Sequence, residues 1–209
     1  QKGYILKTQA NPGYLEIVEG SIFDHELIER LFSDADLCVN LIGILFEKGK
    51  NNFNNIHVEF PKMISRYAST YKLEKFVHLS ALGIENAKDS IYAQSKLKGE
   101  EEILNNFDKA VIVRPSIVYS VDDNFTTQLM TLLGLLPVFP IYYNGKTKFR
   151  PIFCSDLTNS ITKIITDDIK ENIIEFAGPE EMSFKEILEK LLSLIEKKRL
   201  LLPLSLIHI

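Results

Sequence analysis

Phe76-Val-His-Leu-Ser80 and Tyr92-Ala-Gln-Ser-Lys96 carry most of the information about the fold. The first stretch is a short apolar run that ends in a serine, a pattern that indicates a buried strand. The second stretch opens a helical pattern that runs from Ile91 to Asn106. A tyrosine and a lysine four residues apart on a helix share one face. The serine at the end of the strand can therefore face both of them across a cleft.

The Tyr-x-x-x-Lys spacing alone is weak evidence, because it occurs at Tyr71–Lys75, Tyr92–Lys96 and Tyr142–Lys146. The first match straddles the end of one expected helix and the start of a strand. The third contains Asn144-Gly145, which signals a turn. The middle match both opens a helix and follows a strand that ends in serine. Its alternative interpretation, an exposed pair on a helix surface, stays open.

Strand-like and helix-like segments alternate along the first half of the chain. We expect strands at 14–18, 36–43, 75–79 and 110–114, and helices at 24–32, 56–71 and 91–106. This alternation predicts a doubly wound α/β fold with a Rossmann-like parallel sheet. Ligands of such sheets bind at the carboxyl ends of the strands, where the sequence places Ser21, Asn40, Ser80 and Ser116.

The second half of the chain predicts a smaller α/β lobe that is interleaved with the sheet. We expect a helix at 125–135, extended chain at 146–154, a helix that Ser155 and Asp156 cap and that ends near residue 166, a strand at 173–177, and a helix from Ser183 to about residue 198. Ser183-Phe-Lys-Glu186 has the spacing of a capping box. We therefore expect a nucleotide-binding domain over 1–120 and a C-terminal lobe over 121–203.

Composition excludes several classes of function. The net charge of −4 gives no reason to expect nucleic acid as a partner. The longest apolar stretch, Leu129 to Tyr143, is too short to span a membrane and holds two prolines. We expect it to be a helix end and a loop on the core, with a membrane or partner surface as the alternative. Cys38 and Cys154 predict buried free thiols, with a disulfide as the less favoured alternative, and no cluster has the spacing of metal ligands.

Five motifs in order resemble a known family. They are Asn40-Leu-Ile-Gly43, Leu79-Ser-Ala-Leu-Gly83, Tyr92-Ala-Gln-Ser-Lys96, Arg114-Pro-Ser-Ile-Val-Tyr119 and Phe176-Ala-Gly-Pro179. Together they resemble the extended and atypical short-chain dehydrogenase/reductases. Within this family the chain is most similar to the accessory NAD(P)-binding subunit of respiratory complex I and its bacterial relatives, on Val39-Asn-Leu-Ile-Gly-Ile-Leu-Phe-Glu47 and the Ser80–Gly83 turn.

The resemblance implies roles for individual residues. Tyr92 would be the catalytic acid/base, Lys96 would hold the nicotinamide ribose and lower the pKa of the tyrosine, and Ser80 would polarise a substrate carbonyl. Residues expected along the cofactor, NADP or NAD, are Ser21, Asn40, Leu41, Gly43, Lys96, Pro115 and Ser116. Ser21 stands where many relatives have an acid that contacts the adenine. Arg150 would lie near the substrate pocket.

The resemblance leaves three functions open. The cofactor can be structural or redox-sensing in a protein of the complex I accessory type, with respiratory membrane subunits as partners. The chain can instead be an active NAD(P)-dependent reductase, epimerase or dehydratase, or a regulator without enzymatic activity that senses the cofactor. The resemblance implies a cytoplasmic protein, peripheral at the inner membrane in the first case.

Both ends of the chain depart from the family. The family begins with a strand and a glycine-rich loop whose backbone amides hold the pyrophosphate, and this chain starts after them, without the first β-α-β unit. The last six residues, Leu204-Ser-Leu-Ile-His-Ile209, resemble a translated sequencing adapter. We expect this tail to be non-native, which sequencing of the genomic locus would check.

We predict that the 209-residue chain binds NADPH weakly or not at all, because the amides that hold the pyrophosphate are missing. Isothermal titration calorimetry of the purified chain measures this directly. Tight binding would show that the glycine-rich loop is dispensable.

Overall fold

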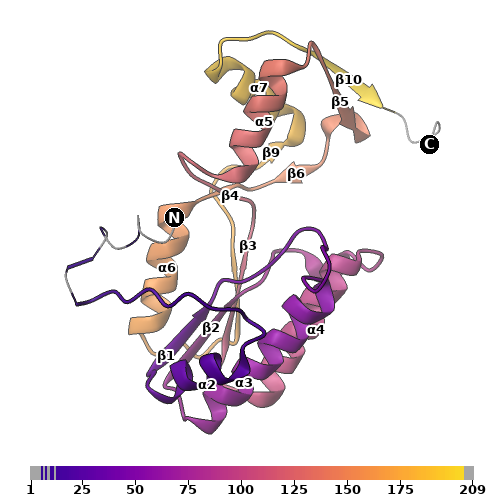
Figure 1. Ribbon diagram of the computed structural model, residues 1–209. Coiled ribbons are helices and arrows are strands. Elements are labelled where there is room, and N and C mark those ends of the chain that lie inside the picture. The colour runs from indigo at the N-terminus through magenta and orange to yellow at the C-terminus, as the bar shows by residue number, and fades with distance from the viewer. Residues whose placement is uncertain (1–5, 7, 9, 12, 205–209) are drawn as a thin grey trace.

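The computed structural model describes residues 6, 8, 10–11 and 13–204, and residues 205–209 of the expected tail lie outside them (Figure 1). Its centre is a parallel sheet of β1 (Leu37–Asn40), β2 (Lys75–Leu79), β3 (Val111–Pro115) and β8 (Ile173–Phe176), in that spatial order. The expected α/β class with a parallel sheet is therefore confirmed.

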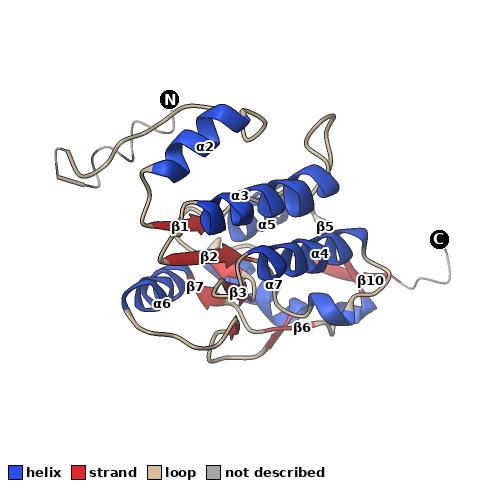
Figure 2. Ribbon diagram, turned by 90° about the horizontal axis from the view of Figure 1, so that it is seen from below, coloured by secondary structure: helices blue, strands red, loops and turns tan. Residues whose placement is uncertain are grey.

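Helices cover both faces of the sheet, as Figures 1 and 2 show. On one face lie α2 (His25–Ser33), α3 (Phe60–Thr70) and α4 (Ile91–Asn106), and α6 (Cys154–Thr166) lies on the other. Two apolar clusters fill these layers. The first holds Phe32, Phe60, Ile64, Phe76, Ile103 and Ile112. The second holds Val77, Val111, Val113, Ile152, Leu157 and Ile164. Burial of this apolar surface is the main force that holds the layers together.

Several local predictions hold because their signals are local. Asp24 caps α2 by accepting a hydrogen bond from the Leu27 N–H, and β2 and α4 have the expected bounds. The expected strand at 14–18 is wrong. This segment lies outside every strand, and 85% of Tyr14 is exposed. A strand forms only where a neighbour pairs with its backbone, and none of the described strands pairs with this segment.

The helix expected at 56–71 starts as a π-helix, η2 (Asn54–Glu59), and continues as α3. Pro61 has no N–H to donate to the preceding turn, and just before it the Phe60 N–H donates five residues back, to the Asn55 oxygen. This wider turn carries the His57 carbonyl towards α4. A Cβ added at Gly99 would lie 1.8 Å from that carbonyl oxygen. Only glycine permits this approach.

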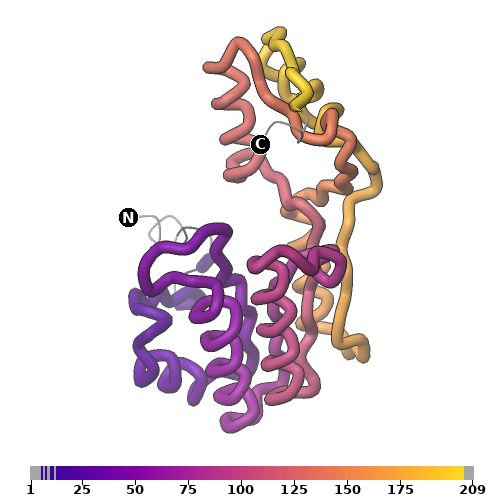
Figure 3. The backbone as a smooth tube through the Cα atoms, turned by 90° about the vertical axis from the view of Figure 1, so that its right-hand side faces the viewer, coloured from indigo at the N-terminus to yellow at the C-terminus, as the bar shows by residue number. Residues whose placement is uncertain are grey.

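The smaller lobe is set apart from the sheet and its helices (Figure 3), and it has its own apolar core. It consists of α5 (Asn124–Leu135), β5 (Val138–Tyr142), η4 (Tyr143–Gly145), β6 (Lys148–Phe149), β9 (Met182–Ser183), α7 (Phe184–Leu194) and β10 (Leu200–Leu204). The capping box of Ser183 and Glu186 is confirmed. The loop expected before Tyr143 is wrong, because β5 pairs in parallel with β10. That pairing joins segments far apart in the sequence. The helix expected to reach residue 198 ends at Leu194.

The chain crosses between the lobes beside a short parallel pair of β4 (Val118–Tyr119) and β7 (Ile152–Phe153). Two expectations fail at the helix that follows. Phe153, not Ser155 or Asp156, occupies the N-cap position of α6, and it makes no side-chain cap. Cys154 is exposed at the start of this helix, whereas Cys38 is half-buried, and both thiols are free.

We predict that Gly99→Ala lowers the free energy of unfolding by about 1–3 kcal/mol or more, because the methyl group forces α4 and η2 apart. Gly134→Ala in α5 is the matched control. Its added Cβ meets only the end of the Lys197 side chain, at 3.8 Å, so we expect a gain of up to about 1 kcal/mol from helix propensity. Urea denaturation of both variants measures the difference, and equal effects would contradict the packing argument.

Candidate functional site

A cavity of about 770 Å³ lies between the carboxyl ends of the sheet and the smaller lobe. Its wall on the sheet side includes Ser80, Tyr92, Pro115 and Ser116. Its other wall comes from the smaller lobe, with Phe125, Lys148, Phe149, Arg150 and Glu181. Hydroxyl groups therefore gather on the side of the sheet, and charged groups gather on the opposite side.

Tyr92 is half-buried in the first turn of α4, where the Ser90 side chain caps the helix. The edges of two rings meet its ring: Phe53 at 5.8 Å and His57 at 5.4 Å between centroids. Burial raises the pKa of the Tyr92 phenol above its usual value. Burial dominates in the structure and Lys96 directs its ammonium at another group, so the lowering of this pKa that the resemblance implies stays a prediction.

Lys96 lies one turn further along α4 and is 5% exposed. Its Nζ donates to the Leu79 carbonyl at 3.1 Å, across to the end of β2. A Cβ added at Gly43 would lie 3.2 Å from this Nζ, so the loop after β1 approaches the ammonium closely. Burial lowers the pKa of Lys96 to about 8, although the charge of Glu100 opposes the shift.

Ser80 follows β2 directly and is anchored by its N–H, which donates to the Val113 carbonyl at 2.7 Å. Its Oγ is buried and has no hydrogen-bond partner among the described residues. Buried hydroxyl groups normally have partners. An unpaired Oγ in the wall that Tyr92 also lines suits an oxygen atom of a bound ligand. The sheet thus brings Ser80 and Tyr92 to one cavity, with Lys96 behind them.

Pro115 and Ser116 border the same cavity at the end of β3. The Pro115 carbonyl accepts from the Leu82 N–H, and the Ser116 N–H donates to the Phe176 carbonyl. Arg150 enters from the smaller lobe, and its guanidinium makes a long contact of 3.4 Å with the Pro179 carbonyl. These three residues lie where a ligand in the cavity would touch them.

The remaining expected cofactor residues do not line this cavity. The amide of Asn40 is buried and bonded internally, and 60% of Leu41 is exposed. Gly43 faces Lys96 instead. Ser21 lies in the turn before α2, where its Oγ accepts from the Phe23 N–H. The first three share the loop after β1, and Ser21 is bonded locally.

Sequence reasoning missed the polar layer beneath the site. A run of three acidic residues such as Glu100 to Glu102 is ordinarily solvated on a helix surface. In fact Glu100 is buried, and its two oxygens accept from the Arg114 guanidinium at 2.7 and 3.1 Å. This pair ties α4 to β3. The only signal in the sequence is that Glu100 stands four residues after Lys96 and so shares its helix face.

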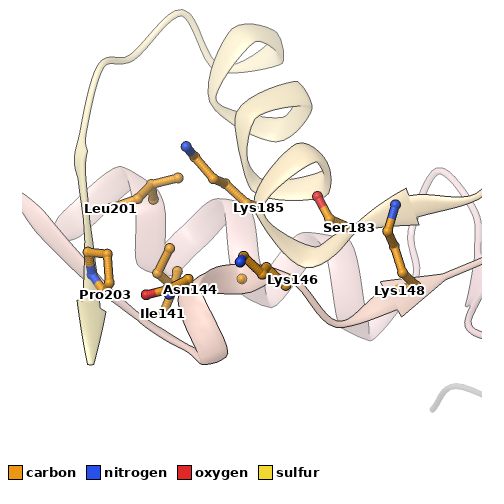
Figure 4. Close-up of a pocket in the computed structure, with 9 residues that line it drawn as sticks. Ile141, Asn144, Lys146, Lys148, Ser183, Lys185, Leu201 and Pro203 are labelled. Atoms are coloured by element: carbon orange, nitrogen blue, oxygen red, sulfur yellow. The ribbon is translucent and has the colours of Figure 1, made fainter. Parts of the chain in front are cut away.

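A second cavity, of about 490 Å³, lies within the smaller lobe (Figure 4). Three of its polar side chains already have partners. Lys185 pairs with Glu189, Lys148 with Glu181, and Ser183 caps α7. None of the residues that the sequence singled out for the site lines this cavity. We therefore place the candidate site between the lobes.

Neither metal binding nor membrane spanning finds support in the described part of the chain. Its His, Cys, Asp and Glu residues form no group of three or more that could hold a metal ion. None of the helices described here is long and apolar enough to cross a membrane.

Comparisons with known proteins show what this chain is similar to. No model of a known protein family matches the chain. It is 28% identical over 188 residues to the mitochondrial NADH dehydrogenase (ubiquinone) 1 alpha subcomplex subunit 9 of Dictyostelium discoideum, which covers 90% of this chain and 52% of the relative. The chain thus spans about half the length of the curated relatives that it matches.

Solved structures match the fold. The UDP-glucuronic acid 4-epimerase of Bacillus cereus in complex with NAD has a TM-score of 0.79 at 20% identity, over 98% of this chain and 73% of that one. The dTDP-4-dehydrorhamnose reductase of Bacillus anthracis in complex with NADP has a TM-score of 0.75 at 17% identity, over 98% and 81%. The fold is therefore that of Rossmann-like reductases and epimerases. Together the comparisons confirm the resemblance to short-chain dehydrogenase/reductases and to accessory subunits of complex I.

We predict that Lys96→Met raises the free energy of unfolding at pH 7 by about 1–2 kcal/mol, although it removes the hydrogen bond to Leu79. Below pH 8 both the folded and the unfolded state hold the proton, so the cost of burying the ammonium is fully present. Between pH 8 and 10.5 the folded state releases the proton while the unfolded state keeps it. The stability of the wild type should therefore rise relative to the variant, and the gap should narrow over this range.

Chemical denaturation at pH 7 and at pH 10 measures this gap. Lys98→Met is the matched control, since Lys98 is exposed on the same helix, and its effect should be small at both pH values. A destabilised Lys96→Met variant at pH 7 would show that the ammonium stabilises the fold.

Proposed function

We propose that this protein is a dinucleotide-binding protein of the complex I accessory-subunit type, in which NADP or NAD has a structural or redox-sensing role. The observation that carries the proposal is the match to a complex I subunit over 90% of this chain. The cleft at the carboxyl ends of the strands, with Ser80 and Tyr92 in its wall and Lys96 behind them, supports it, because such sheets bind nucleotides there.

The residues present fit such a cofactor. Lys96 offers an ammonium beside Gly43, where any larger side chain would crowd it, and this ammonium can donate to a ribose hydroxyl. Pro115 and Ser116 offer a flat wall in the same cleft. Asn40 supports the loop from inside and does not extend towards a ligand. We propose Leu41 and Gly43 as backbone contacts of the cofactor, and Ser21 as a contact further along it.

An active reductase or epimerase is the second candidate, and the unpaired Oγ of Ser80 favours it. This hydroxyl can donate to a carbonyl oxygen that also accepts the phenolic proton of Tyr92, since both residues line one cavity. A bound nicotinamide would supply the hydride. Lys96 would hold the ribose and offset the negative charge left on Tyr92. A regulator that senses the cofactor without turnover is the third candidate.

The same proposal extends to partners and location. Relatives named as subunits of NADH dehydrogenase suggest membrane respiratory subunits as partners of this chain. We propose a position at an inner membrane, peripheral and on its cytoplasmic face. The charged and apolar side chains of the smaller lobe would then be available for contacts with neighbouring subunits.

We predict that the full-length gene product, tagged on the chromosome, co-purifies with complex I subunits in mild detergent. Tyr92→Phe should leave this association unchanged, because the phenol oxygen has no partner among the described residues. Tyr142→Phe, an exposed tyrosine with the same Tyr-x-x-x-Lys spacing, is the matched control. Recovery without any respiratory subunit would contradict the accessory role.

Turnover separates the second candidate from the first. If the protein is a reductase, Tyr92→Phe should lower its kcat by about 10²- to 10⁴-fold, because the proton donor is lost. Oxidation of NADPH with candidate carbonyl compounds, followed by absorbance, measures this rate.

A further inference from the structure

Residues 40–44 comprise the last residue of β1 and the loop after it, and we call them the 40–44 loop. Two backbone N–H groups of this loop point into the protein. The Ile42 N–H donates to Asn40 Oδ1 at 3.1 Å, and the Ile44 N–H donates to His57 Nε2 at 3.1 Å. A backbone N–H can only donate, so each bond fixes the role of its acceptor. These two donors settle the protonation of two buried histidines.

His57 must be a neutral imidazole with its proton on Nδ1. Its Nε2 accepts from Ile44 and therefore carries no proton. Its Nδ1 lies 2.8 Å from Ser95 Oγ, and that hydroxyl donates its single proton to the Tyr92 carbonyl at 2.7 Å. Ser95 can then only accept from the ring, so Nδ1 donates. The ring thus joins the loop to the first turn of α4.

His78 must be the opposite tautomer. Because Asn40 Oδ1 accepts from the backbone, the amide nitrogen of Asn40 faces His78 Nδ1, at 2.9 Å. That amide can only donate, so Nδ1 accepts and the proton lies on Nε2. His78 is 1% exposed, and its Nε2 has no partner among the described residues. The neutral ring therefore supports Asn40, which in turn holds the loop.

Both rings lie near the Lys96 ammonium. A Cβ added at Gly43 would lie 3.2 Å from Lys96 Nζ and 3.8 Å from His57 Nε2, so the loop passes over both groups. Burial, followed by the charge of Lys96, lowers the pKa of His57 to about 4 and that of His78 to about 3. This agrees with two neutral rings, which the hydrogen bonds require independently.

We propose that His57 and His78 are positioning residues that lock the 40–44 loop against Lys96 in opposite neutral tautomers, and so fix Gly43 for the dinucleotide. The lock itself follows from the hydrogen bonds alone. Its use for the dinucleotide rests on the proposed function. Neither ring touches the cofactor or substrate in this proposal, since each acts through the loop.

The tautomers are tested on the unmodified 209-residue chain by long-range ¹H–¹⁵N NMR of the imidazoles at pH 7. We expect the Nδ1-protonated pattern for His57, which is the rarer form of free histidine, and the Nε2-protonated pattern for His78. The reverse tautomer at His57, or a charged ring at either position, would overturn the proposal. Because no residue is changed, this test does not depend on the folding of a variant.

Three variants test the positioning role through amide hydrogen exchange at Ile44. His57→Phe keeps a ring against Phe53 but removes the acceptor, and we expect exchange at Ile44 to become about five- to tenfold faster, as for one lost hydrogen bond. His57→Gln supplies an acceptor oxygen at the end of its chain and should restore protection. His25→Phe, at an exposed position on α2, should change nothing. An unchanged exchange rate at Ile44 in His57→Phe would contradict the proposal that His57 holds the loop.

The link to the dinucleotide is tested by titrating millimolar NADPH into the full-length gene product and following the Gly43 amide signal. We expect a shift in the wild type and in His57→Gln, and a shift reduced about fivefold or more in His57→Phe. A full shift in His57→Phe would overturn the role in positioning. If the wild type itself shows no shift while the tautomer and exchange results hold, the lock stands and the proposed cofactor site fails.

Discussion

The approach of α4 to η2 at Gly99 is the constraint on which the site depends. The His57 carbonyl occupies the space that a Cβ at Gly99 would need. Because the two helices touch there, Ser95 reaches His57 on one side of the contact, and the ring of Tyr92 meets His57 by its edge. The π-helical turn before Pro61 makes this approach possible, as such turns often do near functional sites. A packing contact between two backbones thus sets the geometry of the polar groups.

Three charged side chains, Lys96, Glu100 and Arg114, are buried beneath the site, and their burial does not favour the folded state. Lys96 and Glu100 occupy successive turns of α4. Glu100 forms an ion pair with Arg114 of β3, and Arg114 is only 8% exposed. Buried ion pairs of this kind often contribute little net stability, because desolvation offsets their attraction. Their value here is in geometry: they orient α4 on the sheet. The ammonium of Lys96 donates to a carbonyl and not to a carboxylate. Of these three buried charges it therefore lowers the stability of the fold most, yet the proposed site needs it.

The cleft exists because two lobes with separate cores meet across it. The sheet contributes hydroxyl groups at strand ends. The antiparallel pair β6–β9 and the residues beside it contribute Lys148, Arg150 and Glu181. The chain passes between the lobes several times, and Gly178 packs directly on the Pro151 carbonyl at one of these crossings. This close contact fixes the wall that carries Arg150. The chemistry of the sheet and the shape of the cavity therefore arise from different parts of the chain.

The sequence by itself determined the α/β class, the strand before Ser80, the helix of Tyr92 and Lys96 and the capping box of α7, because each depends on neighbours within one or two turns. Only the tertiary structure decided the rest. The segment 14–18 is no strand without a partner, β5 pairs with a segment some sixty residues away, and Glu100 is buried in an ion pair with Arg114 of β3. Burial also raises the pKa of Tyr92. Burial and pairing are properties of contacts between distant segments, and local sequence patterns do not encode them.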